Sequence, residues 1–186
     1  MNIFLTTCLL LVILSPVTAL LCVGNTRHEY CHGICFTIQI DNHLNSTPNR
    51  RTKWGCMTDC TSDKTTFTTV GNKYFRNIKT CCGKQLCNAT PPPRRDPKLN
   101  GLECPFYCQD SKAPKTVKCF DDETRCMDFI LIRGDAKVPE VFQGCATPSF
   151  CEQASASMID KYLSGNITRP RCYESFPSSE QQSFAG

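Results

Sequence analysis

The cysteines constrain the fold of this chain more than any other feature of its sequence. The 186 residues contain 16 cysteines, a density close to that of small proteins whose folds are held by disulfides. Cys8 lies in an apolar N-terminal run, and the other cysteines follow between Cys22 and Cys172. Disulfides are the default state of cysteines in an oxidising compartment, and the odd number that remains after Cys8 predicts one without a partner in the chain.

The first residues are typical of a secretory signal peptide. The stretch MNIFLTTCLLLVILSPVTA has an apolar run that Ser15-Pro16 interrupts, and it ends in small residues. We predict a signal peptide over residues 1–19, cleaved after about Ala19. The run is shorter than the about 20 apolar residues of a membrane span, and the polar C-terminal tail offers no lipid-anchor signal. We therefore expect a secreted, extracellular protein with no membrane anchor.

A proline-rich segment divides the remaining chain. Residues 91–101 read PPPRRDPKLNG and lack apolar periodicity, so we predict an extended linker there. Eight cysteines lie between the signal peptide and the linker, and seven follow it. This distribution predicts two tandem domains, over 20–90 and 102–186, each of a size at which cross-links supplement a small core.

Strand signals dominate both predicted domains. Apolar and polar residues alternate over 36–40, and turn residues at Gly71-Asn72 separate two strand-like runs, which predicts a hairpin over 64–75. A further strand is predicted over 127–132. The best helical pattern covers 154–163, where apolar residues recur at helical spacing.

The cysteine order of the first domain, closed by Cys81-Cys82-Gly-Lys-Gln-Leu-Cys87-Asn88, resembles the three-finger domain of snake toxins and of the lymphocyte-antigen/urokinase-receptor family. The resemblance covers nearly the whole mature chain. It implies an all-β, disulfide-rich fold of two tandem three-finger domains, in each of which three loops (fingers) project from a disulfide hub. Adjacent cysteines do not readily bond each other, so one bonds back to a finger and the other forward. The resemblance also implies that Asn88 bonds the backbone of the hub.

The family pairing, carried over in order, implies seven disulfides: Cys22–Cys35, Cys31–Cys56, Cys60–Cys81, Cys82–Cys87, Cys104–Cys126, Cys119–Cys145 and Cys151–Cys172. Each should stabilise the fold by about 2–4 kcal/mol. The second domain departs from the family, because the closing CC-x4-CN is absent after Cys172. Cys108 is left over. It can be buried and inert, capped by a small thiol, or bonded to a second chain in a dimer.

The truncated second domain is similar to two groups of secreted proteins: the sodefrin precursor-like factors, which are courtship pheromones, and the gamma-type phospholipase A2 inhibitors. Both imply non-enzymatic recognition of an extracellular protein, either a receptor or a secreted phospholipase A2. The eight-cysteine first domain favours the pheromone, because the gamma-type inhibitors carry ten cysteines there. Inhibition of a phospholipase A2 is the alternative.

We predict no catalytic residues, no metal site, no cofactor and no nucleic-acid partner. The sequence has no phosphate loop, nucleophile elbow or zincin motif. His28, Cys31, His32 and Cys35 have a spacing that a zinc site can use, but the resemblance gives both cysteines disulfide roles. His43 is expected to be solvated at a finger tip.

Candidate binding residues lie at predicted finger tips. Arg50, Arg51 and Lys53 form a cationic tip that suits an aromatic cage. Arg133-Gly134-Asp135 is the integrin-binding tripeptide, although Gly-Asp is also good turn chemistry.

Glycosylation and charge provide two further expectations. Of three Asn-x-Ser/Thr sequons, those at Asn45 and Asn166 are the candidates, because Asn88 is needed in the hub. The charge is also uneven: +5 over residues 22–90, +2 in the linker and −3 from residue 101 onward. The positive half can attract an acidic protein or an anionic lipid surface, or can simply be a solvated face.

Overall fold

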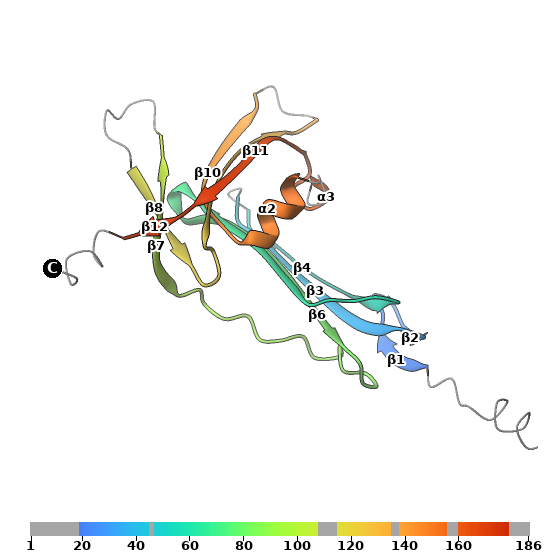
Figure 1. Cartoon of the computed structure of the whole chain (residues 1–186). Coiled ribbons are helices and arrows are strands. Elements are labelled where there is room, and N and C mark those ends of the chain that lie inside the picture. Colours follow the sequence, from blue (N-terminus) through green and yellow to red (C-terminus); the bar gives the residue numbers. More distant parts are fainter. Residues whose placement is uncertain (1–18, 45–46, 108–114, 135–137, 156–159, 179–186) are drawn as a thin grey trace, which may run out of the picture. The chain divides into compact units, whose positions relative to one another are not determined.

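A computed structural model describes residues 19–44, 47–107, 115–134, 138–155 and 160–178 (Figure 1). The chain forms two compact units. Unit 1 comprises Met1–Thr37, Lys53–Thr61 and Cys81–Pro91, and unit 2 comprises Ile38–Thr52, Ser62–Thr80 and Pro92–Gly186. These units are defined by packing. The domain boundaries predicted above, 20–90 and 102–186, follow cysteine order and stay a prediction.

Unit 1 is a disulfide hub. Strand β1 (Leu20–Val23) pairs antiparallel with β2 (His28–Cys31), and buried cysteine sulfurs replace an aliphatic core. Four disulfides lie here: Cys22–Cys35, Cys31–Cys56, Cys60–Cys81 and Cys82–Cys87. Asn88 is 2% exposed; its amide donates to Val23 O (2.8 Å) and Phe36 O (3.0 Å), and its Oδ1 accepts from Val23 N (2.9 Å). One side chain thus satisfies three backbone groups of the hub.

Two sheets organise the rest of the described chain. The larger one has the strand order β11-β9-β10-β5-β6-β3-β4, and the smaller one has the order β12-β7-β8. The large-sheet strands are β3 (Ile34–Asn42), β4 (Asn49–Met57), β5 (Asp63–Thr69), β6 (Lys73–Cys82), β9 (Arg125–Ile132), β10 (Glu140–Ala146) and β11 (Asn166–Glu174). Those of the small sheet are β7 (Leu99–Phe106), β8 (Lys115–Phe120) and β12 (Phe176–Pro177).

The predicted all-β, disulfide-rich three-finger fold is confirmed. In unit 2 the disulfides are Cys104–Cys126, Cys119–Cys145 and Cys151–Cys172. The seven disulfides of the two units join the same cysteines as the pairs that the resemblance implies.

The predicted hairpin is present as β5 and β6, which pair antiparallel from Asp63↔Lys79 to Thr69↔Lys73. A short 3₁₀ turn, η1 (Val70–Asn72), joins them. Gly71 (φ 73°) and Asn72 (φ 56°) adopt the left-handed conformation there, which glycine and asparagine tolerate best. The turn chemistry read from the sequence therefore produces this finger tip.

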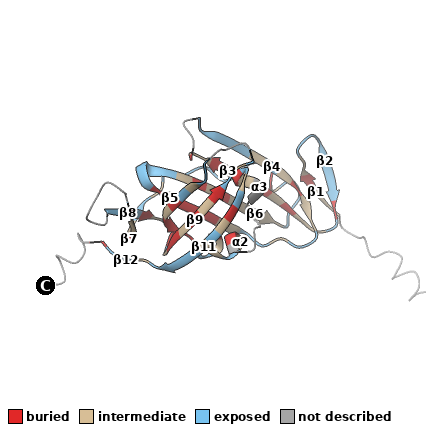
Figure 2. Ribbon diagram, turned by 90° about the horizontal axis from the view of Figure 1, so that it is seen from above, coloured by how far each residue is buried: buried red, intermediate tan, exposed pale blue. Residues whose placement is uncertain are grey.

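The core of unit 2 is centred on Phe67 of β5. This ring is fully buried, and its centroid lies 5.5 Å from Phe129, 6.1 Å from Phe142 and 4.8 Å from Phe150. Strands β5 and β9 accordingly carry many of the buried residues (Figure 2). Phe67 and Phe75 of the predicted first domain thus share one core with three rings of the predicted second domain.

Backbone pairing of β5 with β10 accompanies this packing. Gly144↔Thr69, Cys145↔Thr68 and Ala146↔Phe67 are antiparallel partners. Gly144 has φ 155°, and a Cβ atom placed on it would lie 2.1 Å from the carbonyl oxygen of Thr68. Only glycine allows the two backbones to come so close, so Gly144 is required for this junction.

The helical prediction is wrong at its start. The predicted helix covers 154–163, whereas α2 (Pro148–Ser155) already begins at Pro148. After residues 156–159, which lie outside the description, the described chain continues as α3 (Asp160–Leu163). Thr147 begins α2: its Oγ1 accepts a hydrogen bond from Phe150 N at 3.3 Å, and Pro148 at the first position needs no amide partner. Apolar periodicity alone did not reveal this Thr-Pro start signal.

Residues 91–98 of the predicted linker form no helix or strand, and β7 begins within its predicted range, at Leu99. Gln39 Nε2 donates to Pro92 O (3.1 Å), and Arg94 Nη1 lies 3.2 Å from Asp41 Oδ2. These two contacts hold the linker against β3. Among the described residues, no helix has the length and apolarity needed to cross a membrane.

Replacing Gly144 with alanine should destabilise unit 2. The added Cβ meets the Thr68 carbonyl and forces an unfavourable φ, so we expect a loss of about 2–3 kcal/mol in the free energy of unfolding. Urea denaturation with the disulfides intact measures it. Gly134→Ala is the matched control, because a Cβ at Gly134 has nothing within 4 Å. Equal stabilities of the two variants would contradict the close approach at Gly144.

Candidate interaction surface

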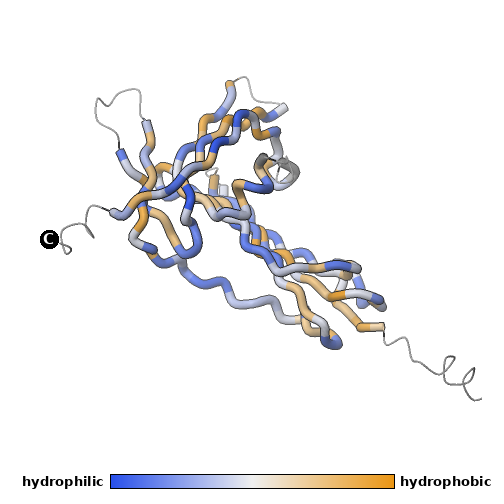
Figure 3. Tube along the Cα trace, in the orientation of Figure 1, coloured by the Kyte–Doolittle hydropathy of each residue, from blue (hydrophilic) through white to orange (hydrophobic). Residues whose placement is uncertain are grey.

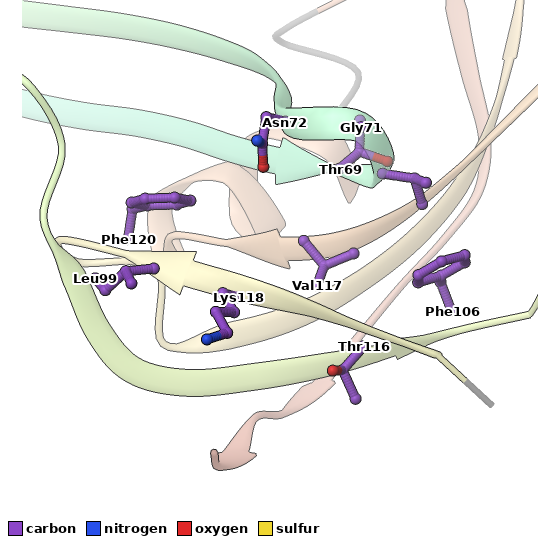
Figure 4. Close-up of a pocket in the computed structure, with 10 residues that line it drawn as sticks. Thr69, Gly71, Asn72, Leu99, Phe106, Thr116, Val117, Lys118 and Phe120 are labelled. Carbon is purple, nitrogen blue, oxygen red and sulfur yellow. The ribbon is translucent and has the colours of Figure 1, made fainter. Parts of the chain in front are cut away.

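A groove of 390 Å³ lies in unit 2 between the tip of the β5–β6 hairpin and the small sheet (Figure 4). One wall is formed by the turn from Thr69 to Asn72. The other wall comes from β7 and β8 and is mainly apolar; it includes Leu99, Phe106, Val117 and Phe120. Two separate hairpins therefore build one concave surface.

A smaller hollow of 220 Å³ adjoins the groove. It shares Thr69, Val70 and Phe106 with the groove and is extended by Tyr107 and Val141. Gln143 lies between the two walls: its carbonyl oxygen accepts from Thr69 Oγ1 (2.7 Å), and its side-chain Oε1 accepts from Tyr107 N (2.9 Å). Both walls are thus held by one residue of β10, which makes the surface pre-organised.

Large apolar side chains around these hollows are exposed. The exposed fractions are 42% for Val70, 56% for Leu99, 74% for Tyr107 and 67% for Val141. Concave apolar surfaces that include an exposed tyrosine have the composition of the centre of a protein–protein interface. We call this surface, made of the groove and the adjoining hollow, the apolar surface.

A buried carboxyl group, that of Glu123, accepts a hydrogen bond from the backbone of a groove residue. Glu123 is 1% exposed. Its Oε1 accepts from Thr66 Oγ1 (3.2 Å) and Thr68 Oγ1 (2.9 Å), and its Oε2 accepts from the backbone N of Phe120 (3.2 Å), a groove residue. Burial raises the pKa of Glu123 to about 7, against the opposing effect of these hydrogen bonds and of the positive charge of Arg76.

The cationic residues predicted as a binding tip lie elsewhere, on β4. Arg50, Arg51 and Lys53 are exposed, and none lines the apolar surface. Arg50 Nε lies 3.0 Å from Asp41 Oδ1, and Arg51 Nε donates to Asn49 Oδ1 (3.0 Å). The structure does not bring these residues together with the groove.

The integrin-like tripeptide is only partly described. The Arg133 side chain is 17% exposed, and its Nε lies 2.9 Å from Glu140 Oε1. An arginine that is mostly covered and ion-paired is poorly placed to meet an acidic receptor. Gly134 is at a turn, while Asp135 lies outside the described residues, so integrin binding stays a prediction with this observation against it.

The glycosylation candidates differ in what the structure says of them. Asn166 is exposed at the start of β11, as a sugar-bearing residue must be. Asn45 lies outside the described residues.

The remaining cysteine predictions concern Cys108 and a possible metal site. Cys108 lies outside the described residues, and the disulfide-linked dimer stays a prediction. The sulfurs of Cys104, Cys119 and Cys145 lie within 4.8 Å of one another, but each is disulfide-bonded and offers no thiolate to a metal.

The expectation for His43 is wrong. Its side chain is 24% exposed and is not simply solvated: the ring stacks on Tyr74 with centroids 4.4 Å apart, and Nε2 lies 3.2 Å from Asp41 Oδ1. The zinc-like spacing at His28 and His32 is also explained without metal, because Cys31 and Cys35 are bonded to Cys56 and Cys22.

Sequence reasoning missed the apolar surface. Its walls come from the β5–β6 turn, from β7 and β8 and from β10, and nothing in the sequence alone predicts that these segments meet. One local signal was present: Val70 is an apolar residue directly before the Gly71-Asn72 turn, at a position where a solvent-exposed tip normally carries a polar residue.

Comparison with known proteins supplies one group of relatives. No protein-family model matches the chain. The phospholipase A2 inhibitor gamma subunits of Elaphe climacophora and Elaphe quadrivirgata are each 27% identical to it over 114 residues, which is 58% of this chain and 56% of each relative. The chain thus spans about half the length of the curated relatives it matches. By fold it is a disulfide-rich protein of the three-finger class.

The stability of unit 2 should depend on pH through Glu123. Its pKa in the folded protein, about 7, exceeds the ordinary value of 4.5. Its favourable contribution is therefore complete below pH 4.5 and is lost as the pH rises to about 7. The expected loss in the free energy of unfolding is about 3 kcal/mol. Urea denaturation at several pH values between 4 and 8 measures the loss.

Glu123→Gln keeps the side-chain shape and removes the ionisation. This variant should lack the decline between pH 4.5 and 7 that the wild type shows. A decline of the same size in both proteins would mean that another group causes it, and would contradict the burial of an ionisable Glu123.

Proposed function

We propose that this protein is a secreted, non-enzymatic recognition protein that binds and inhibits a secreted phospholipase A2. The observation that carries the proposal is the 114-residue match to two proteins named as phospholipase A2 inhibitor gamma subunits. These relatives are named as inhibitors and not as enzymes, which fits the expectation from the sequence that the chain catalyses no reaction.

The structure supports a binding role in two ways. Disulfides hold both compact units, so loops that project from them lose little conformational entropy when they bind. The apolar surface also has the features of an interface centre: it is concave, it exposes Tyr107 and Val141, and its walls are fixed through Gln143. We assign the phospholipase contact to this surface.

The pheromone function, which the cysteine count of the first domain favours, is not supported by the relatives that the chain matches. The inhibitor function is therefore preferred. Because its first domain has eight cysteines, this chain would be an inhibitor with fewer cysteines there than the ten that the gamma-type inhibitors carry.

Purified protein should inhibit at least one member of a panel of secreted phospholipases A2. Hydrolysis of a phospholipid substrate is measured at rising concentrations of the protein. We expect half-inhibition at micromolar concentration or below, which corresponds to a binding free energy of about −8 kcal/mol. Protein whose disulfides have been reduced and alkylated is the control and should not inhibit. No inhibition of any member of the panel would reject the proposed function.

Truncation of an exposed tyrosine in the apolar surface should weaken that inhibition. Tyr107→Ala removes a large aromatic contact, and we expect the affinity for the inhibited phospholipase to fall about 10–30-fold. Tyr30→Ala is the matched control, because Tyr30 is 80% exposed, belongs to unit 1 and does not line the groove. If the Tyr30 variant loses affinity and the Tyr107 variant does not, the proposed function stands, but its assignment to the apolar surface fails.

A further inference from the structure

Positive charge is concentrated in one part of unit 2. Residues 38–52, 62–80 and 92–98, which include two finger segments and the linker, contain nine basic and three acidic side chains, a net charge of +6 with His43 neutral. Five of the nine basic residues are arginines. The linker is also visibly hydrophilic along its path to β7 (Figure 3).

Several of these cations converge on one carboxylate. Asp41 is 13% exposed at its side chain, and its Oδ1 lies 3.0 Å from Arg50 Nε and 3.2 Å from His43 Nε2. Its Oδ2 lies 3.2 Å from Arg94 Nη1. The two guanidinium groups come from β4 and from the linker, and the imidazole comes from the residue directly after β3, so elements that are distant in sequence meet at this point.

The aromatic ring of Tyr74 contacts basic residues of the same region. His43 stacks on it, and the guanidinium carbon of Arg76 lies 4.3 Å from the ring centroid. A hydrogen bond with Tyr74 is the largest of the causes that raise the pKa of Arg50. We call Arg50, Arg76, Arg94 and His43 the basic cluster.

The basic cluster carries more charge than its carboxylate neutralises. The guanidinium groups of Arg50 and Arg94 contact Asp41, and that of Arg76 lies over the ring of Tyr74. The positive charge of Arg76 also acts on the buried Glu123. The side chains of Arg50 and Arg94 remain 59% and 32% exposed. Each guanidinium has five N–H donors, and Arg50 and Arg94 each contact Asp41 through one nitrogen, so further donors stay available to a ligand.

The surroundings of the basic cluster differ from those of the apolar surface. Among the described residues of these three segments, the only large apolar side chain that is substantially exposed is Val70, at the hairpin tip. A protein partner normally needs an apolar centre in its interface. A surface rich in arginine without such a centre instead suits an extended polyanion, which is bound through many separate anionic groups.

We propose that the basic cluster binds a sulfated polysaccharide chain. Guanidinium groups donate paired, charge-assisted hydrogen bonds to the oxygens of tetrahedral anions. Arg51 and Arg95, which directly follow Arg50 and Arg94 in sequence and are exposed, extend the same charge to neighbouring sulfate groups. Such a site would hold the protein on an extracellular matrix while the apolar surface stays free for its protein partner. The site does not depend on the proposed function.

Heparin binding tests the proposal. Titration of the full chain with heparin at physiological salt should show binding that weakens steeply as salt is added, because counterions are released from the polyanion. The double variant Arg50→Gln, Arg94→Gln should lose about tenfold or more in affinity. Arg171→Gln is the matched control, because Arg171 is 77% exposed and its Nε lies 3.0 Å from Asp128 Oδ1; its affinity should stay within about twofold of the wild type.

Three further measurements separate loss of the binding site from loss of folding and test the preference for sulfate. Near-ultraviolet circular dichroism checks the folding of each variant. Because Arg94 also holds the linker, Arg50→Gln alone provides a second variant that leaves the linker contact intact; it should weaken heparin binding several-fold. Hyaluronan, which carries carboxylates without sulfate groups, should bind more weakly than heparin.

Three results would overturn the proposal. The first is the absence of heparin binding at physiological salt. The second is equal heparin affinity of the wild type and the folded Arg50→Gln variant. The third is a double variant that binds heparin normally but no longer inhibits phospholipase A2, which would make the cluster an interface for an acidic protein. A protein that binds heparin through the cluster and inhibits no phospholipase would support this inference and reject only the proposed function.

Discussion

The packing of Phe67 into the core of unit 2 is the interaction on which the surfaces of this unit depend. Phe67 lies on β5 between Thr66 and Thr68, whose hydroxyl groups bond Glu123 on the opposite face of the strand. Its ring contacts Phe129, Phe142 and Phe150, while its backbone pairs with β10. This packing, together with the pairing of β5 with β10 and the bond from Thr69 to Gln143, holds the hairpin tip that forms one wall of the groove.

Disulfides and hydrophobic packing contribute differently to the stability of the two units. Unit 1 has almost no aliphatic core: its buried apolar residues are cysteines, and Asn88 bonds the backbone that they enclose. The described residues of unit 2 include five clustered phenylalanine rings and three disulfides. Cross-links in unit 1 mainly restrict the unfolded chain, whereas unit 2 gains its stability from buried apolar area.

Local chemistry in the sequence predicted local structure well. Gly71-Asn72 predicted the β5–β6 turn, and the strand-like run over 127–132 predicted β9. The resemblance carried by Cys81-Cys82 and Cys87-Asn88 implied the fold. The features that the sequence did not predict depend on contacts between distant segments. Gly144 shows its importance only when Thr68 lies against it, and His43 looked solvated until Tyr74 and Asp41 were placed beside it. The groove was missed for the same reason.

The central claim is that the surface formed by the β5–β6 turn with β7, β8 and β10 binds a phospholipase A2. Hydrogen–deuterium exchange of the protein with and without an inhibited phospholipase tests it most directly. If this surface binds the phospholipase, exchange should be slower in the complex over residues 69–73, 99–107 and 115–120, with little change in β1 and β2. Slower exchange confined to β1 and β2, with the groove segments unchanged, would contradict it.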